Sequence, residues 1–167
     1  LIIFTLAFLI GATVGAREWA DHPTVGRYDD STIRHQEVAR FGEYTIATGP
    51  ETTETLEGEV WMTLYDGPAD SSTFGVYTTY LSFLESNGFE MLVSCRPGEC
   101  PPGALTEVYE REPFADSGDY YFPAVFSQGS DDLAAYIAAK RSGDDVTLYV
   151  SIAIAAGWES YPQYRLD

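Results

Sequence analysis

Apolar and polar residues alternate with a period of two along much of this chain, and that alternation predicts a fold built mainly of β-strands. The strongest case is Val146–Ile154, where every second residue is a branched aliphatic side chain. Leu56–Tyr65 alternates in the same way, which places one strand face on a core and the other toward solvent. Further strands are expected at Thr32–Val38, Phe41–Ala47, Phe89–Ser94 and Tyr161–Leu166.

The segment Leu133–Lys140 is ambiguous by local propensity alone. Its alanines favour a helix. The turn sequence Ser142–Asp145 and the strand Val146–Ile154 follow it, however, and two apolar runs around a Gly-Asp turn are typical of a β-hairpin. We therefore expect Leu133–Lys140 to be a strand.

One segment, Ser71–Asn87, has helical spacing throughout. Ser71 or Ser72 can cap its start, and Gly88 is suited to the left-handed residue that ends a helix. The pattern predicts an α+β fold, an antiparallel sheet of about five to seven strands with one main helix packed across one face. The apolar stripe of this helix is Phe74, Tyr77, Leu81 and Leu84, widened by Tyr80 and Phe83.

Two segments after the cysteines have weaker patterns. Ala104–Arg111 is expected to form a short helix, because Leu105, Val108 and Tyr109 share a face. Glu112–Ser130, which is rich in Pro, Asp and Gly, is expected to be a long loop.

The first sixteen residues indicate export. Leu1–Gly11 is apolar and uncharged, and Val14-Gly15-Ala16 has the small residues that a signal peptidase requires. We expect residues 1–16 to be a signal peptide and residues 17–167 to be a single α+β domain, in the periplasm and in some association with the outer membrane. An uncleaved N-terminal anchor is the alternative. The chain is also expected to be truncated at its start and to continue beyond Asp167, and no transmembrane span is expected in the mature part.

The chain has two cysteines, Cys95 and Cys100, separated by four residues with Pro-Gly at their centre. Such a turn can bring the two sulfur atoms together, and an exported chain favours a disulfide. A metal site and a redox dithiol are the competing interpretations. The first lacks nearby Cys or His ligands in the sequence, and the second usually has two intervening residues.

The formal net charge is −17, and Lys140 is the only lysine. An acidic surface of this kind repels phosphate backbones, so nucleic acid is excluded as a partner. Plain solubility explains the charge, and adaptation to a saline habitat is the alternative hypothesis.

Few residues carry a pattern that points to chemistry. His22 before Pro23 is expected to cap a turn and His35 to lie on a half-exposed strand face, with catalysis as the alternative for each. No Gly-x-Ser-x-Gly nucleophile motif is present and no cofactor is expected. Trp61 and Trp158 are candidate contacts for a partner. No metal site is expected beyond a weak calcium possibility in acidic loops, at Asp116, Asp119, Asp131 and Asp132.

Several short motifs resemble a proteobacterial envelope family with a domain of unknown function. In some of its members this domain precedes an outer-membrane-protein-A-like peptidoglycan-binding domain. The resemblance implies an envelope location and an α+β domain and carries over no catalytic residue. Arg27 is a further candidate functional residue. The motifs are Asp21-His22-Pro23 with Arg27-Tyr28, Phe41–Tyr44, Leu56–Val60, the helix end at Asn87–Glu90, the Cys95/Cys100 pair, and Gly143–Val146.

Two classes of function remain. The first is a non-catalytic binding or structural module that contacts an envelope protein or peptidoglycan through strand edges and exposed aromatic residues. The second is a small periplasmic hydrolase that acts on an envelope polymer through His35 or a pair of carboxylates. A concave pocket that gathers His35 or two carboxylates would favour the hydrolase, whereas a closed core would exclude it.

Overall fold

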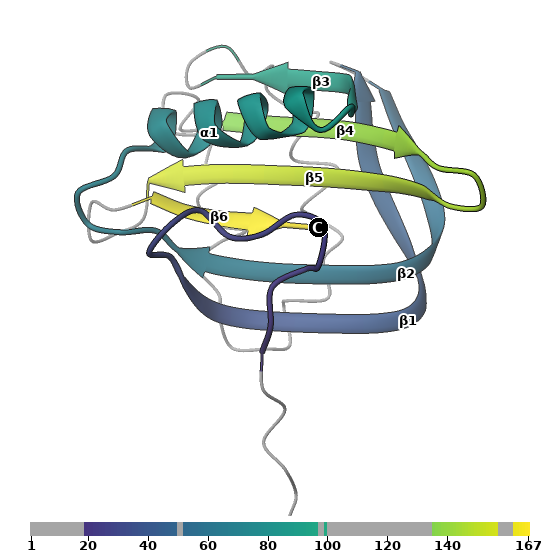
Figure 1. The fold of residues 1–167 in the computed structure, drawn as a ribbon, viewed down its shortest axis with the longest axis horizontal. Helices are drawn as coiled ribbons and strands as arrows, with labels where there is room; N and C mark the ends of the chain where they lie inside the picture. The colour runs from purple at the N-terminus through teal and green to yellow at the C-terminus, as the bar shows by residue number, and fades with distance from the viewer. Residues whose placement is uncertain (1–18, 50–51, 97–98, 100–134, 157–161) are drawn as a thin grey trace, which may run out of the picture.

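The residues that the structure describes form a six-stranded antiparallel sheet with one helix on one face, as the alternation predicts. The computed structural model describes residues 19–49, 52–96, 99, 135–156 and 162–167. In chain order the elements are β1 (Thr32–Gly49), β2 (Thr52–Asp66), α1 (Thr73–Ser86), β3 (Glu90–Cys95), β4 (Ala135–Ser142), β5 (Thr147–Ala156) and β6 (Pro162–Leu166). In the sheet, the strands are ordered β1-β2-β6-β5-β4-β3 (Figure 1).

The helix begins and ends where the sequence predicts. Ser72 is its N-cap, and the Ser72 side chain accepts a hydrogen bond from the backbone N–H of Gly75. Gly88 follows the C-cap with a φ of +75°, a conformation that favours glycine. The predicted stripe is partly wrong, because Phe74 is 53% exposed. Phe74 lies in the first turn, and the side chains that face the sheet are Val76, Tyr77, Tyr80 and Leu84.

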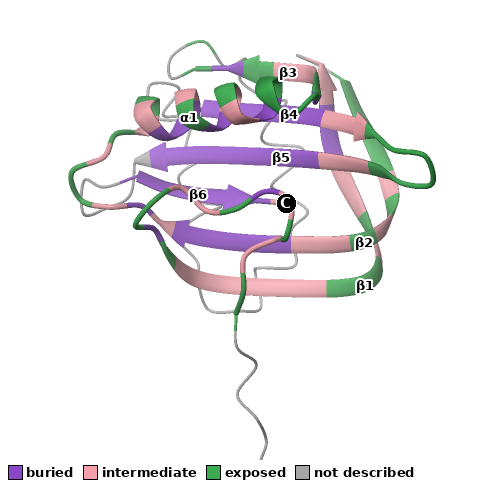
Figure 2. Ribbon diagram, in the orientation of Figure 1, coloured by how far each residue is buried: buried purple, intermediate pink, exposed green. Residues whose placement is uncertain are grey.

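The core on the helix side of the sheet is made by β4, β5 and β6 together with α1. Alternate residues of these strands are buried beneath the helix, and Figure 2 shows this central band as the most buried part of the sheet. Tyr65 and Tyr164 stack with their ring centroids 4.8 Å apart, and Tyr80 lies against Tyr164 at 5.5 Å. The prediction that Leu133–Lys140 is a strand is confirmed by β4, which forms a hairpin with β5.

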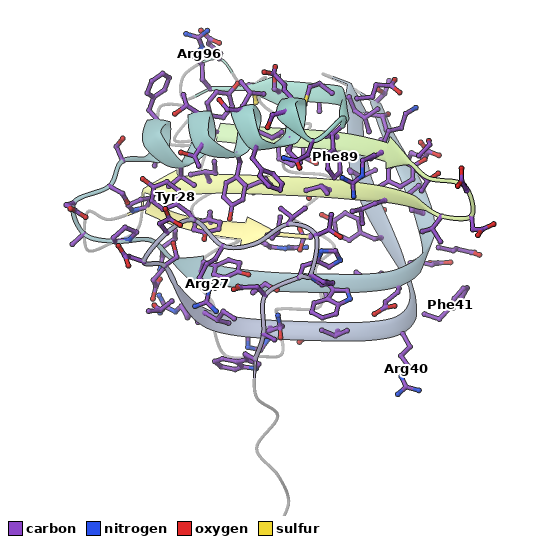
Figure 3. All side chains as sticks on the ribbon, viewed as in Figure 1. Arg27, Tyr28, Arg40, Phe41, Phe89 and Arg96 are labelled. Carbon is purple, nitrogen blue, oxygen red and sulfur yellow. The ribbon has the colours of Figure 1, made fainter. Side chains whose placement is uncertain are left out.

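The region predicted as two strands, Thr32–Val38 and Phe41–Ala47, is one continuous strand. Between Ala39 and Gly42, β1 has one more residue than the facing segment of β2, so the two segments join through a β-bulge. A bulge bends and twists a strand, and the β1–β2 hairpin curves around the far side of the sheet (Figure 1). Arg40 and Phe41 point outward at this bend (Figure 3).

The curved hairpin covers the second face of the sheet. Ile46 and Ala47 of β1 are each 1% exposed. They pack in a cluster with small residues of β4 and β5, namely Ala138, Ala153 and Ala155. The sheet is therefore buried on both faces over its central strands, where the sequence predicts helix cover on one face.

Several predicted features lie outside the described residues. These are the leader Leu1–Ala16, the segments Ala104–Arg111 and Glu112–Ser130, Cys100, and Trp158. Cys95 is buried at the end of β3 and is not a free thiol. Its predicted bridge to Cys100 stays a prediction. In the part of the chain that is described, no helix combines the length and apolar character needed to cross a bilayer.

Candidate functional site

β6 pairs with β2 on one side and with β5 on the other, and the last residue, marked in Figure 1, lies between these two strands. A cavity of about 560 Å³ opens there, within the usual size range of small-ligand sites. We call this cavity the slot. Its walls are residues 56–61 and 63 of β2, residues 145–151, Tyr44 and Ile46 of β1, His22, Pro23, Val25, Leu166 and Asp167.

One end of the slot is closed by a buried ion pair. The side chains of Arg165 and Asp167 are each 1% exposed, and Nε of Arg165 lies 2.6 Å from Oδ1 of Asp167. The other carboxylate oxygen accepts hydrogen bonds from the Tyr44 hydroxyl at 2.8 Å and from Ser151 Oγ at 3.2 Å. Because a buried carboxylate is stable only when its oxygens are paired, these contacts hold β1, β5 and β6 together at the end of the slot.

The helix-side wall of the slot contains two of the predicted residues, His22 and Trp61. Their rings meet edge to face with centroids 5.2 Å apart. His22 Nδ1 accepts hydrogen bonds from the backbone N–H groups of Thr24 and Val25, at 3.2 and 3.3 Å. Burial lowers the pKa of His22, although nearby Glu59 opposes this shift. The imidazole is therefore neutral at pH 7, with its proton on Nε2, and it caps a turn as expected.

The rim of the slot is acidic. Glu57, Glu59 and Asp145 are exposed side chains along it, and none of the lining residues is Lys or Arg. The indole Nε1 of Trp61 donates a hydrogen bond of 2.9 Å to Glu59 Oε1, which positions one carboxylate beside the aromatic wall. A ligand with an apolar body and a positive charge would match this combination.

The N-terminal segment that carries His22 crosses the helix-side face of the sheet and is fixed there by tyrosines. The Tyr80 hydroxyl donates to the carbonyl of Gly26 at 3.1 Å. The Tyr164 hydroxyl accepts from the backbone N–H of Tyr28 at 2.9 Å. Burial raises the pKa of both phenols, so they stay neutral hydrogen-bonding groups.

Arg27 does not line the slot and instead forms an ion pair with Asp21. Its Nε lies 2.9 Å from an oxygen of Asp21, and Asp21 also accepts from the Tyr65 hydroxyl at 3.0 Å. Burial, followed by the Asp21 charge, raises the pKa of Tyr65. Arg27 lies below Tyr28 in Figure 3, and its pair with Asp21 anchors the N-terminal segment.

His35 also lies outside the slot. Its Nε2 is 3.4 Å from Glu37 Oε1, and its ring is 6.3 Å from that of Trp19. The four acidic residues proposed for calcium, Asp116, Asp119, Asp131 and Asp132, lie outside the described residues. Within the described ranges, no group of three or more His, Cys, Asp or Glu side chains is placed to hold a metal ion.

Sequence reasoning missed the residues that close the slot. The alternation in β6 assigns Arg165 and Asp167 to the solvent face. Tyr44 belongs to β1, and no local sequence pattern indicates that this strand is curved. A usable signal is present in β4 and β5, whose second face carries the small residues Ala138, Ser151, Ala153 and Ala155. A face of such small residues favours close packing against another element, and hence cover on both sides of the sheet.

Comparison with known proteins assigns the chain to no family. No protein-family model matches the chain. No curated protein sequence matches it either. The family resemblance drawn from short motifs therefore stays a prediction.

Proposed function

We propose that this chain is an exported, non-catalytic binding module of the periplasm or outer membrane, and that the slot is its binding site. The apolar leader Leu1–Ala16 supports export. The slot carries the binding part of the proposal, because it is a cavity of ligand size with aromatic walls and an acidic rim. An envelope protein or peptidoglycan is the expected partner.

The chemistry of the slot favours binding over the hydrolase alternative. His22 uses Nδ1 to accept two backbone hydrogen bonds, so that nitrogen is not available as a general base. Ser151 does lie next to a carboxylate, that of Asp167, but Ser151 is 0% exposed and Asp167 is paired with Arg165. Of the two features on which the hydrolase hypothesis depends, His35 is not among the lining residues. A group of carboxylates is present, since Glu57, Glu59 and Asp145 line the rim, but all three are exposed and none has the apolar surroundings of a general acid.

A pull-down with matched variants tests this proposal. The folded protein is immobilised and incubated separately with purified peptidoglycan, with its soluble muropeptide fragments, and with outer-membrane extract. Trp61→Ser should abolish capture of the true partner, because Trp61 forms a wall of the slot. Trp19→Ser is the control, since Trp19 is 45% exposed and lies outside the slot. Circular dichroism checks that both variants are folded.

The outcomes separate the two classes of function. Capture that Trp61→Ser removes and Trp19→Ser retains supports the binding module. Failure to capture any of the three materials contradicts it. Chromatography of the muropeptides after incubation would reveal new cleavage products, and their formation would favour the hydrolase instead.

A further inference from the structure

We propose, resting on the function above, that the slot binds an alkylammonium group, and that Trp61 and Glu59 form the subsite for its positive charge. In this proposal the cation lies against the face of the Trp61 indole ring, which attracts positive charge through its π electrons. The Glu59 carboxylate then neutralises the charge beside the ring.

Trp61 and Glu59 project from the same face of β2. Side chains of a strand alternate between its two faces, so both residues share a face with Tyr65. Tyr65 belongs to the core cluster beneath α1, which makes this the helix-side face. Trp61 is only partly buried and Glu59 is exposed, and both line the slot. An indole surface and a carboxylate are therefore accessible to a ligand at the same place.

Hydrogen bonds and ring packing hold this subsite in position. The indole Nε1 of Trp61 donates to Glu59 Oε1 at 2.9 Å, which fixes the carboxylate beside the ring. The His22 ring meets the indole edge to face at 5.2 Å, and the N–H groups of Thr24 and Val25 fix His22 in turn. All of these contacts lie within β2 and the N-terminal segment. A preorganised subsite of this kind loses little conformational entropy when a ligand binds.

The subsite has negative charge around it and no positive charge to balance it. Glu57 and Asp145 lie along the rim with Glu59, and none of the ion pairs among the described residues involves these three carboxylates. No lining residue is Lys or Arg, and His22 is neutral at pH 7 because burial lowers its pKa. An incoming cation therefore meets no competing positive group in the wall of the slot.

The remaining helix-side wall favours an organic cation over a metal ion. Val25, Leu148 and Val150 line the slot and belong to, or pack against, the core cluster beneath α1. An alkyl stem would bury apolar surface against them while its charge lies at Trp61 and Glu59. A metal ion needs several converging ligands, and no group of three or more His, Cys, Asp or Glu side chains is placed for one in the described part of the chain.

NMR titration of the intact protein with choline tests this inference, with 3,3-dimethylbutan-1-ol as the matched neutral probe. The two compounds have the same shape, and a quaternary nitrogen in choline replaces a carbon atom in the alcohol. Backbone amide shifts of Glu59, Trp61 and Tyr149, which all line the slot, give the Kd of each probe. Choline should bind about tenfold more tightly than the alcohol, because only choline carries a charge for the ring and the carboxylate.

Three variants assign this difference to the subsite. Glu59→Gln keeps an acceptor for the indole N–H but loses the charge, so it should weaken choline about fivefold and leave the affinity for the alcohol within about twofold. Trp61→Leu keeps an apolar wall without a π face and should remove most of the preference for choline. Glu54→Gln is the control, since Glu54 is an exposed residue of β2 outside the slot, and it should change either affinity by less than about twofold. Circular dichroism checks that each variant is folded.

Two results would overturn the inference directly. One is equal binding of choline and the alcohol, which would show that the slot recognises only apolar shape. The other is binding of choline that both Glu59→Gln and Trp61→Leu leave unchanged, which would place the cation elsewhere on the protein.

Competition with the pull-down separates this inference from the proposed function. Release of the captured material by choline would show that this material presents the ammonium group to the slot. Choline that binds at Trp61 without releasing the material would identify a free amine as the ligand and count against the captured material as the occupant of the slot. Capture that depends on Trp61, with no binding of choline, would overturn the inference and leave the proposed function in place. Failure of both capture and choline binding would count against both.

Discussion

Replacing Arg165 by methionine removes the positive charge that closes one end of the slot. The Arg165 and Asp167 side chains are each 1% exposed and their closest atoms are 2.6 Å apart. Methionine keeps much of the arginine stem but leaves the Asp167 carboxylate buried, with the hydroxyls of Tyr44 and Ser151 as its remaining side-chain partners among the described residues. Breaking a buried pair in this way costs about 3–5 kcal/mol, because one charge stays behind without compensation.

The size of this effect can be checked against two related changes. A domain of this size has a total stability of about 5–15 kcal/mol, so the loss expected for Arg165→Met is roughly a third of a mid-range stability or more. The double variant Arg165→Met, Asp167→Asn should be less destabilised than Arg165→Met alone, because no unpaired charge remains. Lys140→Met is the surface control. Lys140 lies 3.4 Å from Glu90, and the Glu90 side chain is 68% exposed. An exposed pair of this kind should contribute less than about 1 kcal/mol to the stability.

Urea denaturation followed by tryptophan fluorescence and by circular dichroism gives the free energy of unfolding of each variant. The expected order of stability is wild type and Lys140→Met highest, the double variant intermediate, and Arg165→Met lowest. If Arg165→Met lost no more stability than Lys140→Met, the ion pair would not hold the end of the slot and the reasoning would be refuted.

Three further substitutions test other parts of the account. The pKa of His22 is lowered in the folded protein, so protonation favours the unfolded state, and the wild-type stability should fall as the pH drops below about 6.5. The variant His22→Asn retains an acceptor for the turn but does not titrate in this range. In urea titrations its stability should therefore fall less than that of the wild type between pH 7.5 and 5.5. Gly88→Ala should cost about 1 kcal/mol, because alanine is strained at a φ of +75°, and an unchanged melting temperature would argue against this conformation. Tyr164→Phe keeps the stacked ring but leaves the N–H of Tyr28 without its acceptor, which should cost about 1–3 kcal/mol of unfolding free energy; a neutral effect would mean that water replaces the hydroxyl.

The sequence predicts the local elements well, because each depends on contacts between neighbouring residues. Ser72 and Gly88 mark the helix ends through backbone hydrogen bonding and left-handed φ, and both signals are local. The alternation in Val146–Ile154 reflects one buried face of β5, and the turn before it specifies the hairpin with β4. These features account for the confirmed α+β class and the six-stranded antiparallel sheet.

The slot could not be predicted in the same way, because it depends on contacts between distant parts of the chain. The bulge between Ala39 and Gly42 merges two expected strands and curves the hairpin, and nothing in the alternation of either segment indicates this. The position of β6 between β2 and β5 depends on pairing across residues 63–66 and 152–156, far apart in sequence. His22 and Trp61 were identified as candidates separately, but only the fold brings their rings together.

Backbone amide chemical shifts, followed residue by residue by NMR, test most directly whether the slot is the binding site. Addition of the material captured in the pull-down should shift the amides of Trp61 and Tyr149, which line the slot, and leave those of Trp19 and Glu54, which lie outside it, unchanged. Shifts confined to residues outside the slot would contradict the account.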